Sequence, residues 1–355
     1  MKKISSLLLI LGMLFSIVSC TNEPGPGEKD DDDNNNKFES IDAPDHNVIV
    51  AYVTSWSSGK PDPNLITHIN YAFGDVNKTF NGITINNPAR LREMASLKKQ
   101  NPQLKVLLSI GGWGSGGFSE MAANKTNRQA FAADCAKIIK DYGIDGIDID
   151  WEYPGSSVAG ISSSSSDMSN FTLLMRDIRS AIGRDNLLTI ATIASAKFIS
   201  FRDVMPYLNY VNIMSYDLGE APLHHSALYK SKNTPSQTCD SSVKAHLAAG
   251  IPAGKLVMGM PFYGRGKAGT AAVNYKSIVI PDDCSVYFDE EAMVPFIADA
   301  DGALIFGFDN PSSLTAKCKY IMDNGLLGAM YWEFGGDNDK KELATAVYNG
   351  IFGLK

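Results

Sequence analysis

The sequence lacks an excess of basic charge. Its 355 residues carry 32 lysines and arginines against 39 aspartates and glutamates, which gives a net charge of −7. Proteins that bind nucleic acid usually show a basic patch or stripe, and none is evident along this chain. We therefore expect no nucleic-acid partner.

Motifs for metal or cofactor binding are also missing. The five cysteines contain no CxxC pair and the five histidines form no HExxH pattern, so no metal site is expected. Two G-x-G-x-x-G matches, at Gly112 and Gly264, lack the compact strand-turn-helix context of a dinucleotide site. No cofactor is therefore expected.

Cysteines are few, and four lie beyond residue 20. Cys135 and Cys318 fall on apolar faces of expected helices, so we expect both to be buried thiols. Cys239 and Cys284 lie in expected connections and could form a disulfide, because the chain has features of an exported protein.

A long apolar run at the N-terminus follows Lys2 and Lys3 and ends at small residues beside Cys20. Residues 1–19 resemble a bacterial lipoprotein signal peptide, which would leave Cys20 as the lipidated N-terminus. Residues 20–46, with four consecutive aspartates, then form a flexible acidic spacer. We expect an exported protein, lipid-anchored to a bacterial membrane at the outer membrane or cell surface. A plain signal peptide or an uncleaved anchor is the alternative.

From residue 47 to 355, short apolar runs alternate with segments of helical spacing. Eight strands alternating with helices predict a closed (β/α)8 TIM barrel, with an open doubly wound sheet as the alternative. The first and fifth connections have little room for a full helix, whereas residues 266–311 are long enough for a small α+β insertion after strand seven. Strands are expected at 48–53, 66–73, 104–110, 144–152, 187–195, 210–216, 256–262 and 327–333.

The fourth of these runs carries the most informative residues. Side chains alternate along a strand, so Asp148, Asp150 and Glu152 share one face at intervals of roughly 6.6 Å. Inside a barrel these carboxyls would repel one another and lose hydration, so at least one should hold a proton near neutral pH. General-acid cleavage of a glycosidic bond requires such a protonated acid. A buried hydrogen-bonded ladder or a cation site is the alternative, and Asp145, on the opposite face, is expected to be structural.

Tryptophans gather at the expected strand ends. A barrel places its active site where strands end and loops begin, and a flat indole ring with a polar N–H suits ligand contact there. Ordinary core packing is the alternative, above all for Trp151, whose neighbours take the inward face. The four tryptophans are Trp56, Trp113, Trp151 and Trp332.

Residues 145–154 read Asp-Gly-Ile-Asp-Ile-Asp-Trp-Glu-Tyr-Pro. This segment resembles the catalytic signature of the family-18 glycoside hydrolases, the chitinases in particular. The resemblance covers about residues 47–355 and implies a TIM barrel that cleaves β-1,4 bonds between N-acetylglucosamine units. Further matching motifs lie at Tyr71-Ala72-Phe73, Ser109-Ile110-Gly111-Gly112, Met214-Ser215-Tyr216-Asp217 and Met330-Tyr331-Trp332-Glu333.

The resemblance also implies a retaining mechanism assisted by the substrate. Glu152 would protonate the leaving oxygen while the carbonyl oxygen of the sugar's N-acetyl group attacks the anomeric carbon. Asp150 and Tyr216 would hold that group, and Asp148 would tune Asp150. Ser109 would support the carboxylates. Substrate contacts are expected from Trp332, Tyr52, Met214, Asp217, Phe73 and Trp113, and ordinary packing in the barrel core is the alternative for Tyr52, Tyr71 and Phe73.

The substrate is expected to be an oligo- or polysaccharide that contains N-acetylglucosamine. The segment 266–311 is shorter than the insertion of many long-cleft chitinases, which favours short oligomers over crystalline chitin. An endo-β-N-acetylglucosaminidase that acts on the chitobiose core of N-glycans is an alternative. A non-catalytic glycan-binding protein on the same fold is another, although such relatives commonly lose the acid that Glu152 provides.

Overall fold

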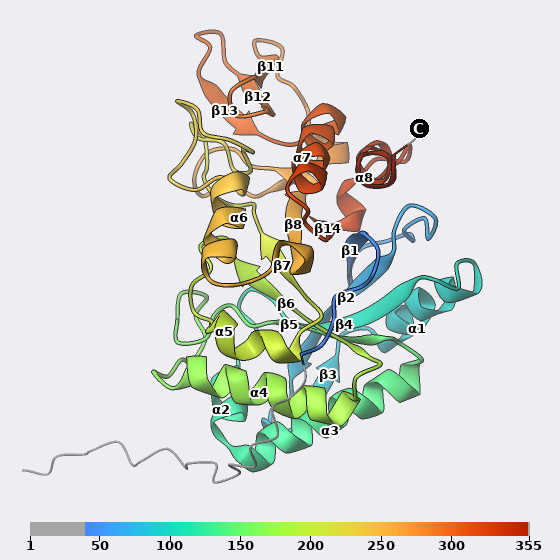
Figure 1. Ribbon diagram of the computed structural model, residues 1–355. Coiled ribbons are helices and arrows are strands. Elements are labelled where there is room, and N and C mark those ends of the chain that lie inside the picture. The colour runs from blue at the N-terminus through green and yellow to red at the C-terminus, as the bar shows by residue number, and fades with distance from the viewer. Residues whose placement is uncertain (1–39, 354–355) are drawn as a thin grey trace, which may run out of the picture. The chain divides into compact units, whose positions relative to one another are not determined.

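The structure is a computed structural model and describes residues 40–353 (Figure 1). The expected signal peptide, Cys20 and most of the expected spacer lie outside the described residues. The folded part begins before residue 47, because Ile41 is buried and its N–H donates to the Pro206 carbonyl at 3.1 Å. The Ile41 carbonyl in turn accepts from Lys255.

Eight parallel strands form the barrel, and each of the eight expected runs contributes one of them. Strand β1 pairs with β2 on one side and with β14 on the other, where Val48 lies opposite Gly328. This pairing closes the sheet, so the doubly wound alternative is wrong. The strands are β1 Val48–Thr54, β2 His68–Val76, β4 Lys105–Gly111, β5 Gly146–Asp150, β6 Leu187–Ile193, β7 Tyr210–Met214, β8 Leu256–Pro261 and β14 Gly328–Trp332; β3 Ile83–Ile85 adds an antiparallel hairpin to β2.

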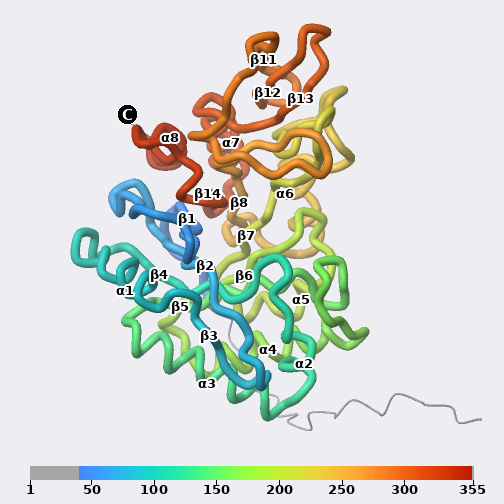
Figure 2. The backbone as a smooth tube through the Cα atoms, turned by 180° about the vertical axis from the view of Figure 1, so that it is seen from behind, coloured from blue at the N-terminus to red at the C-terminus, as the bar shows by residue number. Residues whose placement is uncertain are grey.

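Helices cover the outside of the barrel. Figure 2 shows α3 and α4 side by side on one flank and α7 beside α8 on another. The β1–β2 connection has no helix, and the β6–β7 connection has only the short α5 and one 3-10 turn, as the connection lengths predict. No helix within residues 40–353 is long and apolar enough to span a membrane. The α-helices are α1 Pro88–Ser96, α2 Phe118–Ala123, α3 Lys125–Tyr142, α4 Asp167–Ile182, α5 Phe201–Val204, α6 Cys239–Ala248, α7 Pro311–Asp323 and α8 Glu342–Phe352.

The insertion after β8 is built from strands. Its only regular helical element is one 3-10 turn, Tyr275–Ser277, so the expected α+β character is wrong. Valine, phenylalanine and tyrosine recur in this segment, and such residues favour strands over helices. Strands β11, β12 and β13 form an antiparallel sheet, seen in orange in Figure 1. The strands are β9 Tyr263–Gly264, β10 Val273–Asn274, β11 Ser285–Asp289, β12 Val294–Ala298 and β13 Leu304–Gly307.

The barrel strands separate two apolar regions. Ile147 and Ile149 belong to the core that includes the surrounding helices, whereas Tyr52 and Met330 belong to a cluster inside the barrel. Asp148 accepts a hydrogen bond from Tyr52 of that inner cluster, so the alternation expected for the acidic strand is confirmed within β5, whose last residue is Asp150. The barrel interior also holds polar side chains, and that is where the candidate site begins.

The cysteines of the described part are all free thiols. Cys135 on α3 and Cys318 on α7 are buried, as expected from their helical spacing. Cys239 is buried at the start of α6, where its thiol donates to the Ser215 carbonyl at 3.3 Å. Cys284 lies at a partly exposed position before β11, so the disulfide considered for Cys239 and Cys284 is not formed.

Candidate active site

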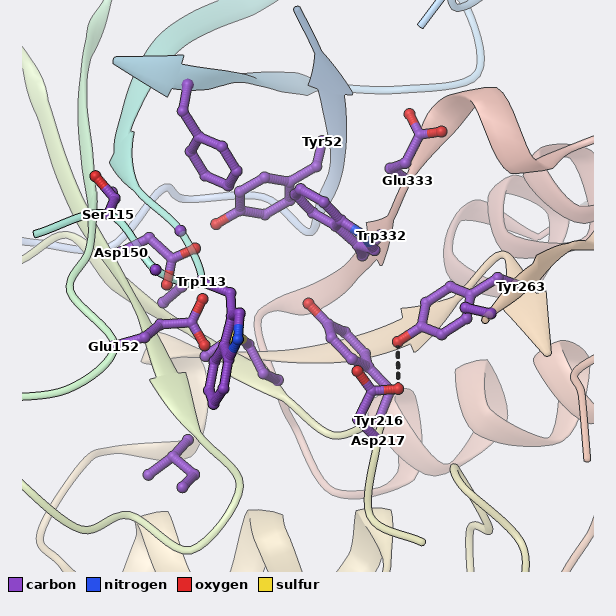
Figure 3. Close-up of a pocket in the computed structure, with 18 of the residues that line it drawn as sticks. Tyr52, Trp113, Ser115, Asp150, Glu152, Tyr216, Asp217, Tyr263, Trp332 and Glu333 are labelled. Atoms are coloured by element: carbon purple, nitrogen blue, oxygen red, sulfur yellow. Dashed lines mark hydrogen bonds between the residues drawn. The ribbon is translucent and has the colours of Figure 1, made fainter. Parts of the chain in front are cut away.

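The carboxyl ends of the barrel strands surround a cavity of about 1150 Å³ (Figure 3). A TIM barrel carries its active site at this end. Asp148 and Ser109 do not line the cavity and lie beneath it, fully buried. The other expected site residues all line it: Tyr52, Phe73, Trp113, Asp150, Glu152, Met214, Tyr216, Asp217 and Trp332.

Asp148 is fully hydrogen-bonded. Ser109 on β4 and Thr189 on β6 lie opposite it on the two neighbouring strands, and their hydroxyls donate to it at 2.8 and 2.6 Å. Tyr52 donates at 2.7 Å and the Asn212 amide at 3.3 Å. Burial raises the pKa of Asp148, and these four donors oppose that rise. The carboxyl is therefore held in one orientation.

Asp150 and Glu152 are buried but less completely bonded. They are 4% and 8% exposed, and Figure 3 shows both on one wall of the cavity. Oδ1 of Asp150 has no hydrogen-bond partner among the described residues. Burial, followed by the charges of Glu152 and Asp148, raises the pKa of Asp150 well above its ordinary value. Burial likewise raises the pKa of Glu152 to about 7, so the pair retains a proton near neutral pH.

Two glycines at the end of β4 permit this arrangement. Gly111 lies opposite Asp150, and a Cβ there would come within 2.0 Å of the Asp150 carbonyl oxygen. The next residue, Gly112, donates its N–H to the same oxygen at 2.9 Å. A Cβ on Gly112 would lie 2.6 Å from the Phe73 ring. Glycine at both positions is therefore required by the close approach of β4, β5 and Phe73.

Aromatic rings form one side of the cavity. Phe73 stacks on Trp332 with 5.6 Å between ring centroids, and Tyr52 lies against the same indole at 5.6 Å. Trp113 and Trp56 also line the cavity and are 64% and 68% exposed, so their faces are open to a ligand. Sugar rings present apolar C–H faces that pack on such surfaces.

Trp151 has a different environment from the other three tryptophans. It is buried away from the cavity and stacks on Phe118 of α2, with 5.3 Å between ring centroids. The core alternative therefore holds for this residue. Asp145 is structural as expected, because it accepts from Lys98 at 2.8 Å and from the Val106 N–H at 2.8 Å.

Tyr216 faces Asp150 and Glu152 across the cavity (Figure 3). Burial, with added repulsion from Asp150 and Asp217, raises the pKa of its phenol well above the ordinary value. The hydroxyl therefore stays protonated and can donate a hydrogen bond. Its hydrogen-bond contact within the described chain is the Met330 sulfur at 3.8 Å.

Tyr263 and Arg265 belong to the site and were missed by the sequence analysis. Tyr263 donates to Asp217 at 2.7 Å, and the Arg265 guanidinium donates to both Asp217 oxygens. Burial opposes ionisation of Asp217, but His225, Arg265 and Tyr263 outweigh it and hold its pKa well below the ordinary range. The available signal was that Tyr-Gly-Arg directly follows an expected strand, and the other site motifs lie at the ends of expected strands.

Thr189 and Asn212, which donate to Asp148, were also missed by the sequence analysis. Each is a polar residue within an otherwise apolar strand, on β6 and β7 respectively. The alternation of side chains along each strand shows which face these residues take but not which residue they meet. The register between strands, which brings them to Asp148, is needed as well.

Within residues 40–353 no group of three or more His, Cys, Asp or Glu side chains is arranged to hold a metal ion. The chemistry available in the cavity is that of a protonated carboxylic acid, a second buried carboxyl, a neutral phenol and an aromatic wall. At the carboxyl end of a (β/α)8 barrel, this combination is suited to acid-catalysed cleavage of a glycosidic bond, the reaction of a glycoside hydrolase.

Comparison with known proteins gives the family. The sequence pattern described as "Glycosyl hydrolases family 18" matches residues 48–337. The chain therefore belongs to glycosyl hydrolase family 18. Chitinase A1 of Niallia circulans is 29% identical over 96% of this chain, which spans 62% of that relative's length. Chitotriosidase-1 of Mus musculus is 31% identical over 82% of this chain and 74% of its own.

Solved structures agree with the barrel. A family-18 N-acetylglucosaminidase from Paenibacillus barengoltzii superposes with a TM-score of 0.79 at 32% identity, covering 86% of this chain and 100% of that one. The Group IV chitinase of Ostrinia furnacalis in complex with allosamidin gives a TM-score of 0.77 at 27% identity, covering 87% of this chain and 98% of that one.

Proposed function

We propose that this protein hydrolyses β-1,4 bonds between N-acetylglucosamine units of chitin oligosaccharides, with retention of configuration and participation of the substrate. The observation that carries the proposal is the buried pair Asp150 and Glu152 beside the Trp332 ring, in one cavity. The chitinases among its relatives support the choice of substrate class.

In the first step Glu152 gives its proton to the glycosidic oxygen as the bond to the anomeric carbon breaks. The carbonyl oxygen of the substrate's own acetamido group forms the new bond to that carbon, which produces a cyclic cation. Oδ1 of Asp150, which lacks a protein partner among the described residues, would accept the acetamido N–H. The Tyr216 phenol would donate to the carbonyl oxygen and hold the group in position.

In the second step the Glu152 carboxylate accepts a proton from water as the water oxygen attacks the anomeric carbon. The bond between the acetamido oxygen and the anomeric carbon breaks, which opens the ring of the cyclic cation and restores the acetamido group. Two successive displacements at the anomeric carbon leave the sugar with its original configuration. Asp148 takes no part in proton transfer in this scheme. Its four hydrogen bonds fix a carboxyl directly below Asp150, where its charge adds to the effects of burial and of Glu152 in raising the pKa of that residue.

Short oligomers are the substrates we propose, since only a small strand-built insertion flanks the cavity. Beyond β8, the polar side chains that this segment adds to the lining are those of Tyr263, Arg265 and Asn274. Sustained release of sugar from crystalline chitin at the rate seen with a soluble hexamer would contradict this choice.

The test is product analysis by mass spectrometry after incubation with N-acetylglucosamine hexamer, with Glu152→Gln as the control. Dimer and trimer from the wild-type protein alone are expected. If neither protein yields products, the same pair is incubated with an N-glycosylated peptide. Release of the glycan with one N-acetylglucosamine left on the peptide would establish the endo-N-acetylglucosaminidase alternative, and binding without cleavage would establish a glycan-binding protein.

We also propose that the protein is exported and lipid-anchored through Cys20, as its N-terminal sequence predicts. Expressed in a bacterium, the wild-type chain should fractionate with membranes and carry a mass increase from acyl chains. The Cys20→Ser variant should lack both properties. A wild-type protein recovered in the soluble fraction without acylation would refute the anchor.

A further inference from the structure

A fully buried ion pair lies outside the cavity. Lys317 on α7 and Asp309, just before that helix, are both 0% exposed, with 2.7 Å between Nζ and Oδ2. Removing two charges from water is costly, so such a pair is weak evidence of stabilisation, and fixing one specific arrangement is a better-attested role. The proposed chemistry does not involve either residue.

The lysine is linked to the segment that carries Tyr216. Its Nζ donates to the Ser226 hydroxyl oxygen at 2.8 Å. An ammonium group can only donate, so the Ser226 oxygen accepts there and its own proton is directed to the Ser215 carbonyl, 2.9 Å away. The lysine therefore fixes the direction in which the serine hydroxyl donates. Ser215 immediately precedes Tyr216 in the chain.

The backbone at Ser215 is held from two further directions. The Cys239 thiol is a second donor to the same carbonyl, at 3.3 Å. The Ser215 hydroxyl donates to the Gly259 carbonyl on the neighbouring strand β8, at 2.8 Å. These contacts immobilise the peptide unit that joins Ser215 to Tyr216. The Tyr216 hydroxyl itself contacts only a sulfur at 3.8 Å within the described chain, so its position depends on its backbone and ring packing.

We infer that Lys317 and Asp309, acting through Ser226, are positioning residues for the Tyr216 phenol. They touch no substrate and set the place from which Tyr216 donates. The inference rests on the proposed function, because it takes the phenol to hold the acetamido group during the reaction. It predicts that loss of the Ser226 hydroxyl lowers kcat only while that phenol is present.

The test is a double-mutant cycle between Ser226→Ala and Tyr216→Phe, with kcat and KM measured on N-acetylglucosamine hexamer. Ser226→Ala is expected to lower kcat on the order of tenfold, with KM changed by less than about twofold, because a small misplacement of a positioned group is costly. In the Tyr216→Phe background the same change should lower kcat by less than about twofold, since interacting sites are not additive.

Cys135→Ala is the matched control. Cys135 is buried on α3, and its thiol takes no part in the contacts around Ser215, Ser226 or Asp309. The substitution should lower the melting temperature as Ser226→Ala does, with kcat unchanged. If Ser226→Ala fails to fold, Cys239→Ala removes the other side-chain donor to Ser215 and should show the same dependence on Tyr216.

The outcomes separate this inference from the proposed function. If Tyr216→Phe alone leaves kcat unchanged, the role proposed for the phenol fails, and the inference fails with it. If Tyr216→Phe is impaired but the effects of the two substitutions multiply, the proposed function stands and the positioning role is wrong. A kcat loss in Cys135→Ala equal to that in Ser226→Ala would also overturn the inference, because general destabilisation would then explain both.

Discussion

Replacing Glu152 with glutamine should abolish hydrolysis and also stabilise the fold above neutral pH. Burial raises the pKa of Glu152 from 4.5 to about 7, so the unfolded chain ionises this carboxyl more readily than the folded protein does. Below pH 4.5 the group is protonated in both states and costs nothing. Between pH 4.5 and about 7 the unfolded chain ionises this carboxyl while the folded protein keeps it protonated, so the free energy of unfolding falls. Above about pH 7 the loss is complete, at roughly 3 kcal/mol from about 1.36 kcal/mol per pKa unit. A neutral glutamine avoids that loss.

Urea unfolding of both proteins at about pH 4.5 and about pH 8 measures this effect. Relative to the wild type, the free energy of unfolding of Glu152→Gln should rise by roughly 3 kcal/mol between the two conditions. Glu290→Gln changes an exposed glutamate in the β11–β12 connection and should show no such rise. A Glu152→Gln difference that is the same at both pH values would refute the assignment of a buried acid with a raised pKa.

Three further outcomes are expected. The value of kcat/KM should fall as the pH rises through about 7, because Glu152 must be protonated to act, and a flat profile to about pH 9 would contradict that role. Gly112→Ala should destabilise the fold by roughly 1–3 kcal/mol, because φ at this position is +92°. It should also raise KM for the hexamer several-fold, because the new Cβ would push Phe73 against Trp332. Unchanged hexamer kinetics would disprove the close approach. Of the thiols in residues 40–353, Cys284 should react first with a maleimide in the folded protein, and the absence of a labelled site there would indicate that it is blocked.

The barrel could be predicted because its signals are local. Each strand is a short apolar run, and the two-residue period places Asp148 and Asp150 on the face opposite Ile147 without knowledge of any neighbour. The insertion was harder to predict, since its strands depend on pairing with one another over a long, irregular segment. Cys239 was placed in a connection but is the first residue of α6, and the side chain of Thr238 caps this helix by accepting from the Ser241 N–H.

The partners of the site residues could not be predicted because they depend on register. Thr189 reaches Asp148 only because β5 and β6 pair with these two residues opposite each other. Tyr263 and Arg265 meet Asp217 from a different connection, 46 and 48 residues further along the chain. Sequence spacing carries no information about such distances in space, so the carboxyls could be found while their surroundings could not.

Those surroundings explain how three similar carboxyls on one strand can have different roles. Asp148 lies at a level where β4 and β6 supply hydroxyls, so its oxygens are occupied. One level higher β4 supplies Gly111, which has no side chain to donate, and an oxygen of Asp150 is left for a ligand. Glu152 lies two residues beyond the end of β5, where it reaches the cavity but remains buried enough to keep a proton near neutral pH. Position along the strand, rather than residue type, therefore separates the supporting carboxyl, the one that accepts from the substrate, and the acid.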